Sequence, residues 1–273
     1  MAYLDVEPAR AIYFEHQVRG PTTVLLSHGW GMGCRVWDTT VAALNDAGIS
    51  TVAYDHRCCG RSDKTFADVS IEALGGDVVA LCDHLGLSTP ILNGWSLGGA
   101  VVVEAARRMG SRIGGMVLTA AATPRFTRCR DFPHGGTPED VAGTVAAVRA
   151  DRVNVLHGLY HSGVFARDVS AQIKDWAWRI ALEASPAADA SLGALASLDQ
   201  REALRGLNVP ALVVIGGKDG VVVPAIQRAA ADCLPQCTRV EFAASGHAPF
   251  IEEPAAYHAA LLQFVRAVSG AAR

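Results

Sequence analysis

Short apolar segments alternate with longer amphipathic segments along most of this chain. The short segments predict buried or half-buried strands at residues 23–27, 50–54, 90–93, 115–119, 211–215 and 239–242. The longer segments carry apolar residues at three- and four-residue spacing, which predicts helices at residues 36–47, 71–85, 97–109, 225–233 and 255–268. Strands and helices in alternation predict an α/β fold, with a mostly parallel sheet that helices cover on both faces.

One interval, residues 124–206, lacks a convincing strand. A helix start is predicted at Thr137, which is followed by Pro138 and two acidic residues in the first turn. Apolar spacing then predicts consecutive helices at residues 141–148, 153–159, 173–183 and 192–204. We therefore divide the chain into a core domain, residues 1–123 and 207–273, and an inserted helical cap, residues 124–206. Such a cap would cover the C-terminal edge of the sheet, where open α/β sheets bind ligands.

Composition limits the kinds of binding partner and the cellular compartment that we expect for this protein. The chain has 273 residues, a net charge of -3 and 50% hydrophobic residues, which suits one large soluble domain and does not favour nucleic acid. No apolar run reaches the length of about 18 residues that a membrane span needs. The N-terminus lacks the pattern of a signal peptide, so we expect a cytoplasmic protein. The seven cysteines lack paired spacing, so we expect reduced thiols and no metal site.

Ser96 lies between two glycines in the sequence Gly94-Trp95-Ser96-Leu97-Gly98. A predicted strand ends here and a predicted helix begins, so the chain must turn sharply at the serine. In such a turn the serine backbone is strained, and the residues two positions away must lack side chains. A glycine-rich turn can also serve packing alone. The other loops favour a nucleophile elbow, which lifts the Ser96 hydroxyl above the end of the sheet.

The loop after the first predicted parallel strand can supply an oxyanion hole. Residues 27–31, Ser-His-Gly-Trp-Gly, form a glycine-rich turn that can present the backbone N–H of Trp30. The carboxyl ends of parallel strands meet at one edge of a sheet, so this turn can approach the serine. The N–H of Leu97, at the start of the next helix, would be the second donor. We interpret His28 as a brace of the loop through hydrogen bonds.

A general base and its acidic partner are predicted in the last two strand-end loops. His247 lies on a glycine-containing loop after the final strand, from which its ring can reach the serine. Asp219 follows the strand at residues 211–215 and can hold the histidine ring in the tautomer that proton transfer requires. Asp199 is a competitor, but it falls in a helical region. The order serine, aspartate, histidine is typical of enzymes with a nucleophile elbow.

These motifs resemble those of the α/β-hydrolase superfamily, and within it those of bacterial aryl esterases and cofactor-free haloperoxidases. The resemblance covers nearly the whole chain and rests on residues 27–30, 54–57, 60–63, 94–99 and 246–247. It implies an eight-stranded sheet with a small helical cap, esterase activity on small esters, a perhydrolase or haloperoxidase side activity, and a homo-oligomer. The sequence departs from many relatives at Cys58 and Cys59, where they have a glycine and an aromatic residue, and at Leu97, where methionine is frequent.

The combined pattern predicts acyl transfer from a small-molecule ester to water. Ser96 would attack the carbonyl with His247 as base and Asp219 behind it, while Trp30 and Leu97 hold the oxyanion. No metal or organic cofactor is required. Lactone hydrolysis and carbon–carbon bond hydrolysis use the same triad and remain alternatives. A small-molecule binding protein that keeps the fold without turnover is a further alternative.

Overall fold

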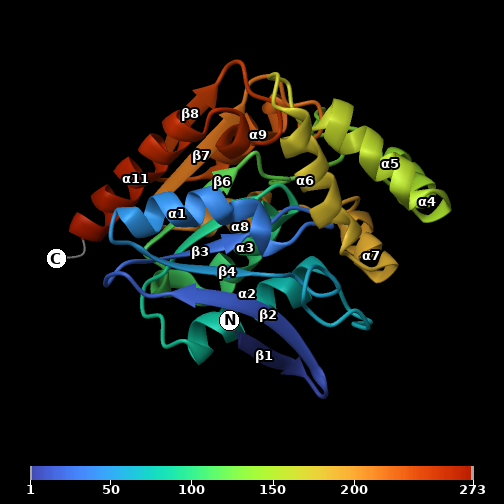
Figure 1. Ribbon diagram of the computed structural model, residues 1–273. Coiled ribbons are helices and arrows are strands. Elements are labelled where there is room, and N and C mark those ends of the chain that lie inside the picture. The colour runs from blue at the N-terminus through green and yellow to red at the C-terminus, as the bar shows by residue number, and fades with distance from the viewer. Residues whose placement is uncertain (1, 272–273) are drawn as a thin grey trace.

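The computed structural model describes residues 2–271, and a twisted eight-stranded sheet forms its centre (Figure 1). In chain order the strands are β1 (Ala2–Glu7), β2 (Arg10–Gln17), β3 (Thr23–Ser27), β4 (Ser50–Tyr54), β5 (Ile91–Trp95), β6 (Gly115–Thr119), β7 (Ala211–Gly216) and β8 (Cys237–Phe242). Across the sheet they follow the order β1-β2-β4-β3-β5-β6-β7-β8. Strand β2 runs antiparallel to β1 and β4, and the remaining neighbours are parallel. The predicted mostly parallel sheet is confirmed.

Helices cover both faces of this sheet. They are α1 (Asp38–Asp46), α2 (Ile71–His84), α3 (Leu97–Met109), α9 (Pro224–Cys233), α10 (Pro249–Glu252) and α11 (Pro254–Ala271). Neighbouring residues of β3 pack to opposite sides: Leu25 joins an apolar cluster with α2 and α3, whereas Val24 and Leu26 join a cluster with α1 and α11. Figure 1 shows these two helix pairs on opposite sides of the sheet. Burial on both faces explains why the strands read as continuous apolar runs.

The strands and core helices that the pattern predicts all occur, with bounds that differ by at most a few residues. The pattern did not predict β1 and β2. In β1 the side chains alternate between half-buried and exposed, and charged residues such as Asp5 and Glu15 interrupt the apolar positions of the two strands. These strands are held by antiparallel pairing at the edge of the sheet, which a run of apolar residues does not signal. The strand count of eight agrees with the resemblance.

Between β6 and β7 the chain forms helices, most of which lie on the right side of Figure 1. They are α4 (Pro138–Ala150), α5 (Arg152–Gly158), α6 (Ala171–Leu182), α7 (Asp189–Ala194) and α8 (Arg201–Gly206). Helix α4 begins at the predicted position. The Thr137 side chain accepts a hydrogen bond from the Asp140 N–H, and the Asp140 carboxylate accepts one from the Thr137 N–H. This capping box satisfies N–H groups that the first helical turn leaves without partners.

The single helix predicted at residues 192–204 is wrong, because α7 ends at Ala194 and α8 begins at Arg201. Buried Gln200 lies in the interruption. Its backbone N–H donates to the carbonyl of Pro124 at 2.8 Å, and its side-chain amide donates to the carbonyl of Ala100 at 2.8 Å. Non-local hydrogen bonds of this kind hold the segment against the core, and they override its local helical spacing.

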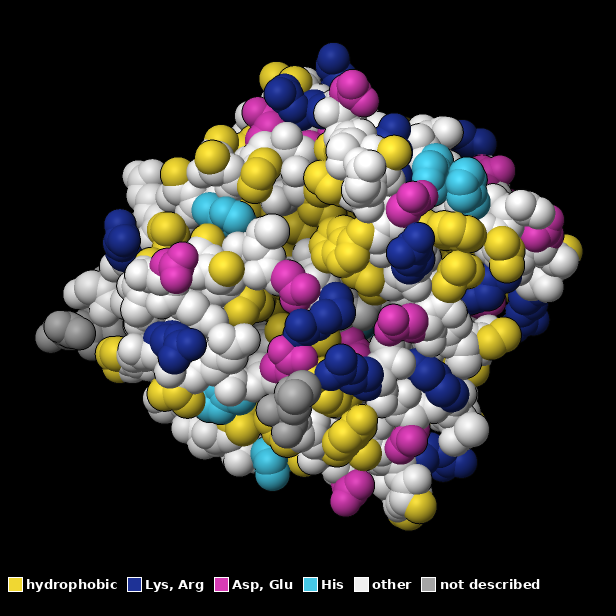
Figure 2. Space-filling model, in the orientation of Figure 1, with side chains coloured by type: hydrophobic (Ala, Val, Ile, Leu, Met, Phe, Trp, Pro, Cys, Tyr) yellow, Lys and Arg dark blue, Asp and Glu magenta, His cyan; other side chains and the backbone are white. Residues whose placement is uncertain are grey.

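The surface of the molecule carries charges of both signs. On the face shown in Figure 2, cationic and anionic side chains are interspersed, so this face presents no extended field of one sign. Among residues 2–271, no helix combines the length and the apolar character that crossing a lipid bilayer requires.

Candidate active site

Ser96 occupies the sharp turn between β5 and α3. Its backbone has φ 55° and ψ -124°, a strained conformation for a residue with a side chain. A side-chain carbon added to Gly94 would lie 2.2 Å from the carbonyl oxygen of Gly98. One added to Gly98 would lie 2.4 Å from the carbonyl oxygens of Ser27 and His28. Both glycines are therefore required by close backbone packing, which is the geometry of a nucleophile elbow.

The predicted acid and base form a buried pair. Nδ1 of His247 lies 2.7 Å from Oδ2 of Asp219, so the ring donates to the carboxylate. The other carboxylate oxygen accepts hydrogen bonds from the N–H groups of Val221, at 2.8 Å, and Val222, at 2.9 Å. The Gln227 amide donates to Oδ2 at 2.8 Å. With Nδ1 engaged in this way, Nε2 of the histidine is the nitrogen available to a nucleophile.

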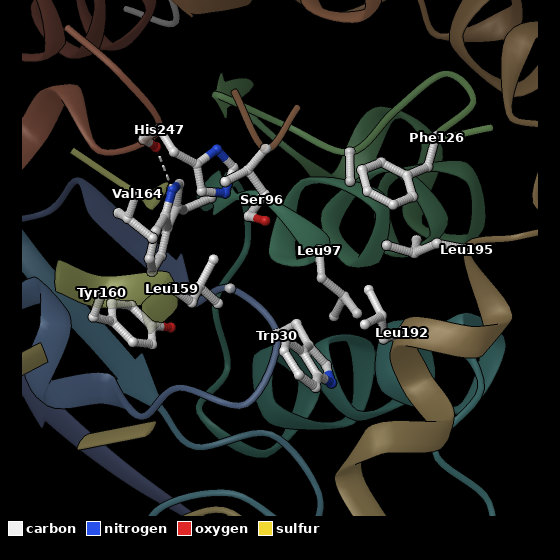
Figure 3. Close-up of a pocket in the computed structure, with 14 residues that line it drawn as sticks. Trp30, Ser96, Leu97, Phe126, Leu159, Tyr160, Val164, Leu192, Leu195 and His247 are labelled. Carbon is white, nitrogen blue, oxygen red and sulfur yellow. Dashed lines mark hydrogen bonds between the residues drawn. The ribbon is translucent and has the colours of Figure 1, made fainter. Parts of the chain in front are cut away.

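Ser96 and His247 line the same pocket, and Figure 3 shows their side chains next to each other at one wall of it. The loop that carries the histidine is fixed from two sides. The indole N–H of Trp95 donates to the His247 carbonyl at 2.7 Å, and the His247 N–H donates to the carbonyl of Val164 at 2.8 Å. The structure therefore brings together all three residues predicted for the triad, although they are far apart in sequence.

The backbone N–H groups of Trp30 and Leu97 also belong to residues that line this pocket. Within residues 2–271, neither N–H donates a hydrogen bond to another group of the protein. The Gly29 carbonyl, which shares a peptide group with the Trp30 N–H, lies 2.7 Å from Nδ1 of His28. The Met32 N–H also donates to this carbonyl, at 3.2 Å. Because C=O and N–H point in opposite directions across a trans peptide, His28 and the Met32 N–H together set the direction of the Trp30 donor. The predicted brace is thus a hydrogen bond between the His28 ring and the backbone of its own loop.

The tautomer of His28 is itself fixed by a second buried histidine. The backbone N–H of His56 donates to Nε2 of His28 at 2.9 Å, so Nδ1 carries the proton that the Gly29 carbonyl accepts. The two rings are stacked, with centroids 3.8 Å apart. Burial lowers the pKa of His28, and burial together with the neighbouring ring lowers the pKa of His56 well below its usual range. Both rings are therefore neutral near pH 7.

The pocket next to Ser96 is small and mostly apolar. Its free volume is about 50 Å³. One water needs about 10–15 Å³ on the same measure, so the pocket has room for only a few non-hydrogen atoms. Besides the residues described above, its walls include Phe126, Leu159, Tyr160, Val164, Leu192 and Leu195, several of which come from the helical region after β6 (Figure 3). We call this space the inner pocket.

A larger space adjoins the inner pocket and shares part of its wall. Its free volume is about 400 Å³, and we call it the outer pocket. The residues that line both pockets are Trp30, Phe126, Leu159, Leu192 and Val221. The outer pocket is lined mainly by apolar side chains and glycines, with Asp140 as its charged residue among the described residues. Together the two pockets form a site of two unequal compartments.

Several functional contacts were not predicted from the sequence. Gln227, which holds Asp219, lies on α9 eight residues later along the chain and carries no motif. Leu159, Leu192 and Leu195 line the inner pocket from the region between β6 and β7, whose arrangement in space periodicity does not reveal. Asp199, the competing acid, instead pairs with the guanidinium groups of Arg201 and Arg125. Asp199 therefore forms ion pairs with arginines, whereas Asp219 is the carboxylate that contacts His247.

The adjacent Cys58 and Cys59, at which the sequence departs from many relatives, are both buried. Burial raises the pKa of both thiols, which keeps them protonated and poorly nucleophilic near pH 7. Cys58 also accepts a hydrogen bond at its carbonyl from the Ser185 N–H at 2.8 Å. The pair therefore packs beneath the helical region.

In residues 2–271, no group of three or more histidine, cysteine, aspartate or glutamate side chains is arranged to hold a metal ion. The residues that line the inner pocket include Ser96, with its hydroxyl, and His247, with its ring, beside the backbone N–H groups of Trp30 and Leu97. These groups are suited to nucleophilic attack, proton transfer and binding of an oxyanion.

The chain is similar in sequence and in structure to known proteins of one family. A family model described as alpha/beta hydrolase fold matches residues 22–254. The AB hydrolase superfamily protein YisY of Bacillus subtilis is 29% identical over 264 residues, which span 96% of this chain and 98% of that protein. An esterase from Exiguobacterium antarcticum superposes with a TM-score of 0.91 at 25% identity, covering 94% of this chain and 96% of its own. A bromoperoxidase from Bacillus anthracis has a TM-score of 0.89 at 26% identity, with the same coverage.

Proposed function

This chain belongs to the alpha/beta hydrolase fold family, and within that family we propose that it is a serine carboxylic ester hydrolase. The observation that carries the proposal is the 2.7 Å pairing of His247 with Asp219 in a pocket that also contains Ser96 on its strained turn. The similarity to a solved esterase over nearly the whole chain supports the same class of reaction. We propose ester cleavage in two steps, through an acyl-enzyme.

In the first step, the Ser96 oxygen bonds to the ester carbonyl carbon while Nε2 of His247 takes the hydroxyl proton. The C–O bond to the alcohol then breaks, and the alcohol leaves with the proton from the imidazolium. In the second step, water attacks the acyl group and passes a proton to the same nitrogen. The Ser96–acyl bond then breaks, and the imidazolium returns this proton to the Ser96 oxygen, which releases the carboxylic acid and restores the enzyme. Asp219 stabilises the imidazolium in both steps and holds the ring in its tautomer.

The oxyanion of each tetrahedral intermediate would be held by the N–H groups of Trp30 and Leu97. Both groups lack a partner within the protein in the described residues, so they are free to bind a developing negative charge. In enzymes of this kind, removal of one such donor typically lowers kcat by about 100- to 1000-fold. The orientation that His28 and Gly29 give to the Trp30 peptide is therefore part of the proposed machinery.

The size of the inner pocket suggests which part of an ester it accepts. Its free volume of about 50 Å³ suits a short acyl group, while the outer pocket, about 400 Å³, suits a larger alcohol. We propose that the helical segment predicted at residues 124–206 acts as the cap of the site. Leu159 and Leu192 of this segment line both pockets, so they separate the two halves of a bound ester.

Hydrolysis of p-nitrophenyl acetate tests this proposal. We expect the wild-type protein to release nitrophenolate, and we expect Ser96→Ala and His247→Ala to lower kcat by at least about 1000-fold. The rate of the wild-type protein should rise with pH across the range in which a histidine titrates, because only the neutral ring accepts the serine proton. The exposed His84 provides a control, since His84→Ala should retain wild-type turnover.

A parallel screen separates the alternatives that use the same triad. Rapid hydrolysis of lactones or cleavage of diketones, with slow ester hydrolysis, would replace the ester assignment with one of these reactions. Equal and negligible turnover by the wild-type protein and Ser96→Ala, together with tight ligand binding, would indicate a binding protein. Unchanged ester turnover in Ser96→Ala would contradict the proposed nucleophile.

A further inference from the structure

Glu252 is a buried carboxylate five residues after the proposed base. It ends the short helix α10, and 8% of its surface is exposed. Its carboxylate accepts hydrogen bonds from two parts of the molecule that are distant in sequence.

One set of hydrogen bonds comes from the loop that carries His247. The N–H of Gly246 donates to both carboxylate oxygens of Glu252 at 2.9 Å, and the N–H of Ala248 donates to Oε1 at 3.1 Å. These donors lie one residue before and one residue after His247. The carboxylate therefore fixes the backbone on both sides of the proposed base.

A second set comes from the segment between α5 and α6. The N–H groups of Ala166 and Arg167 both donate to Oε2 of Glu252 at 2.9 Å. The histidine loop packs closely here, because a side-chain carbon on Gly246 would lie 2.7 Å from both the Ala166 nitrogen and the Val164 oxygen. The same carboxylate thus joins the histidine loop to the segment that carries Val164, a wall of the inner pocket.

The pattern of donors differs from that of an ordinary ion pair. Among the described residues, no arginine, lysine or histidine lies within ion-pair distance of Glu252; the Arg167 guanidinium instead lies 4.0 Å from Glu253. Backbone N–H groups alone compensate the buried charge, and bonds of this charge-assisted kind are short and strong. Because backbone groups are the partners, the carboxylate fixes the position of the chain itself.

We propose that Glu252 is a positioning residue for His247, and that it joins the base to the helical segment over the active site. This inference rests on the proposed function of His247 as base. Displacement of a catalytic group by about 1 Å can lower the rate by about 100-fold, so a buried carboxylate that fixes both flanking peptides contributes to turnover. Glu252 does not touch the substrate; it acts through the histidine.

The variant Glu252→Gln tests the proposal, because it keeps the size of the side chain. One oxygen becomes an NH₂ group, which cannot accept from the N–H groups that face it. Whichever oxygen is replaced, at least one of the two sets of hydrogen bonds is weakened. We expect kcat for p-nitrophenyl acetate to fall by about 10- to 100-fold, with KM changed by less than about threefold.

Three comparisons separate positioning from general stability. Activity is expressed per Ser96 that reacts with an aryl phosphonate, so unfolded protein does not contribute. Glu252→Asp keeps the charge with a shorter side chain and should restore part of kcat. Glu253→Gln alters the neighbouring carboxylate, which accepts from the Ser245 hydroxyl and is partly exposed, and it should retain wild-type kcat.

The outcomes distinguish this proposal from the proposed function. A wild-type protein that neither hydrolyses esters nor reacts with the phosphonate would overturn the proposed function and this proposal with it. An active wild-type protein whose Glu252→Gln variant keeps kcat per reactive serine within about twofold would overturn the role of Glu252 alone. Amide hydrogen exchange adds a direct readout: exchange at Ala166 and at Gly246 should accelerate in Glu252→Gln, and unchanged exchange at both would also overturn it.

Discussion

At Ser96 a positive φ of 55° is maintained by packing that leaves no room for side chains at Gly94 and Gly98. Hydrogen bonds in the same site also orient the side chains of the proposed acid and base. Asp219 accepts from the N–H groups of Val221 and Val222, as well as from the His247 ring and the Gln227 amide. At the scale of single residues, orientation of the acid and base is therefore shared among several buried partners.

Gln227→Leu measures the contribution of one such partner. The substitution removes the donor to Asp219 and leaves the Gly216 N–H without its acceptor. Hydrogen bonds to charged groups are worth about 1.5–3 kcal/mol, so we expect kcat to fall by about 10-fold or more with little change in KM. Thermal unfolding should report a lower Tm. Gln236→Leu, at an exposed site, is the matched control, and equal kcat in the two variants would contradict a role for Gln227.

The residues of the proposed triad could be predicted from sequence because each belongs to a local pattern at the end of a strand. Gly94 and Gly98 mark the turn at Ser96, and His247 follows a glycine after the last strand. Gln227 and Glu252 could not be predicted in this way. Their roles arise from contacts between an element and a loop, and neither residue has a neighbour in sequence that signals those contacts.

At the scale of elements, the parallel strands were predictable because burial on both faces makes them continuously apolar. The antiparallel β1 and β2, at one edge of the sheet, contain both polar and apolar residues, so a search for apolar runs did not predict them. In the helical region, Gln200 breaks the helix predicted at residues 192–204 through bonds to Pro124 and Ala100. Tertiary hydrogen bonds thus shape the elements that line the pocket.

Leu195→Ala tests whether this helical region limits the acyl group. Leu195 lines the inner pocket, is 2% exposed and follows α7 directly. Removing its side chain should enlarge the pocket, so we expect kcat/KM for hexanoyl relative to acetyl p-nitrophenyl esters to rise by about 10-fold. Leu198→Ala, which changes a nearby residue that lines neither pocket, should leave the ratio unchanged. An unchanged ratio in Leu195→Ala would contradict the assignment of the inner pocket to the acyl group.

At the scale of the whole molecule, buried neutral histidines link folding to pH. The pKa of His28 and that of His56 are both lowered, chiefly by burial, and burial also lowers those of His16 and His258. An unfolded histidine has a pKa near 6.5, so below about this pH the unfolded chain binds more protons than the folded one. The stabilising contribution of these groups is therefore complete above about pH 6.5 and is lost as the pH falls.

Urea denaturation at pH 7.5, 6.5 and 5.5 checks this prediction. We expect the free energy of unfolding of the wild-type protein to decrease from pH 7.5 to 5.5. His56→Asn should be less stable at pH 7.5, yet its stability should depend less steeply on pH, because one buried group no longer gains a proton on unfolding. His84→Asn, at an exposed site, should keep the wild-type slope. A His56→Asn slope equal to that of the wild type would contradict the linkage.

The proposed mechanism depends on Ser96 as the nucleophile, and the mass of the protein after reaction with an aryl phosphonate is a direct test of this role. The Ser96 oxygen should displace the aryl oxide from phosphorus, which adds one phosphonyl group per chain, and peptide mapping should place the group on Ser96. Ser96→Ala should gain no mass under the same conditions. Modification of another residue, or equal modification of Ser96→Ala and the wild-type protein, would contradict the proposed mechanism.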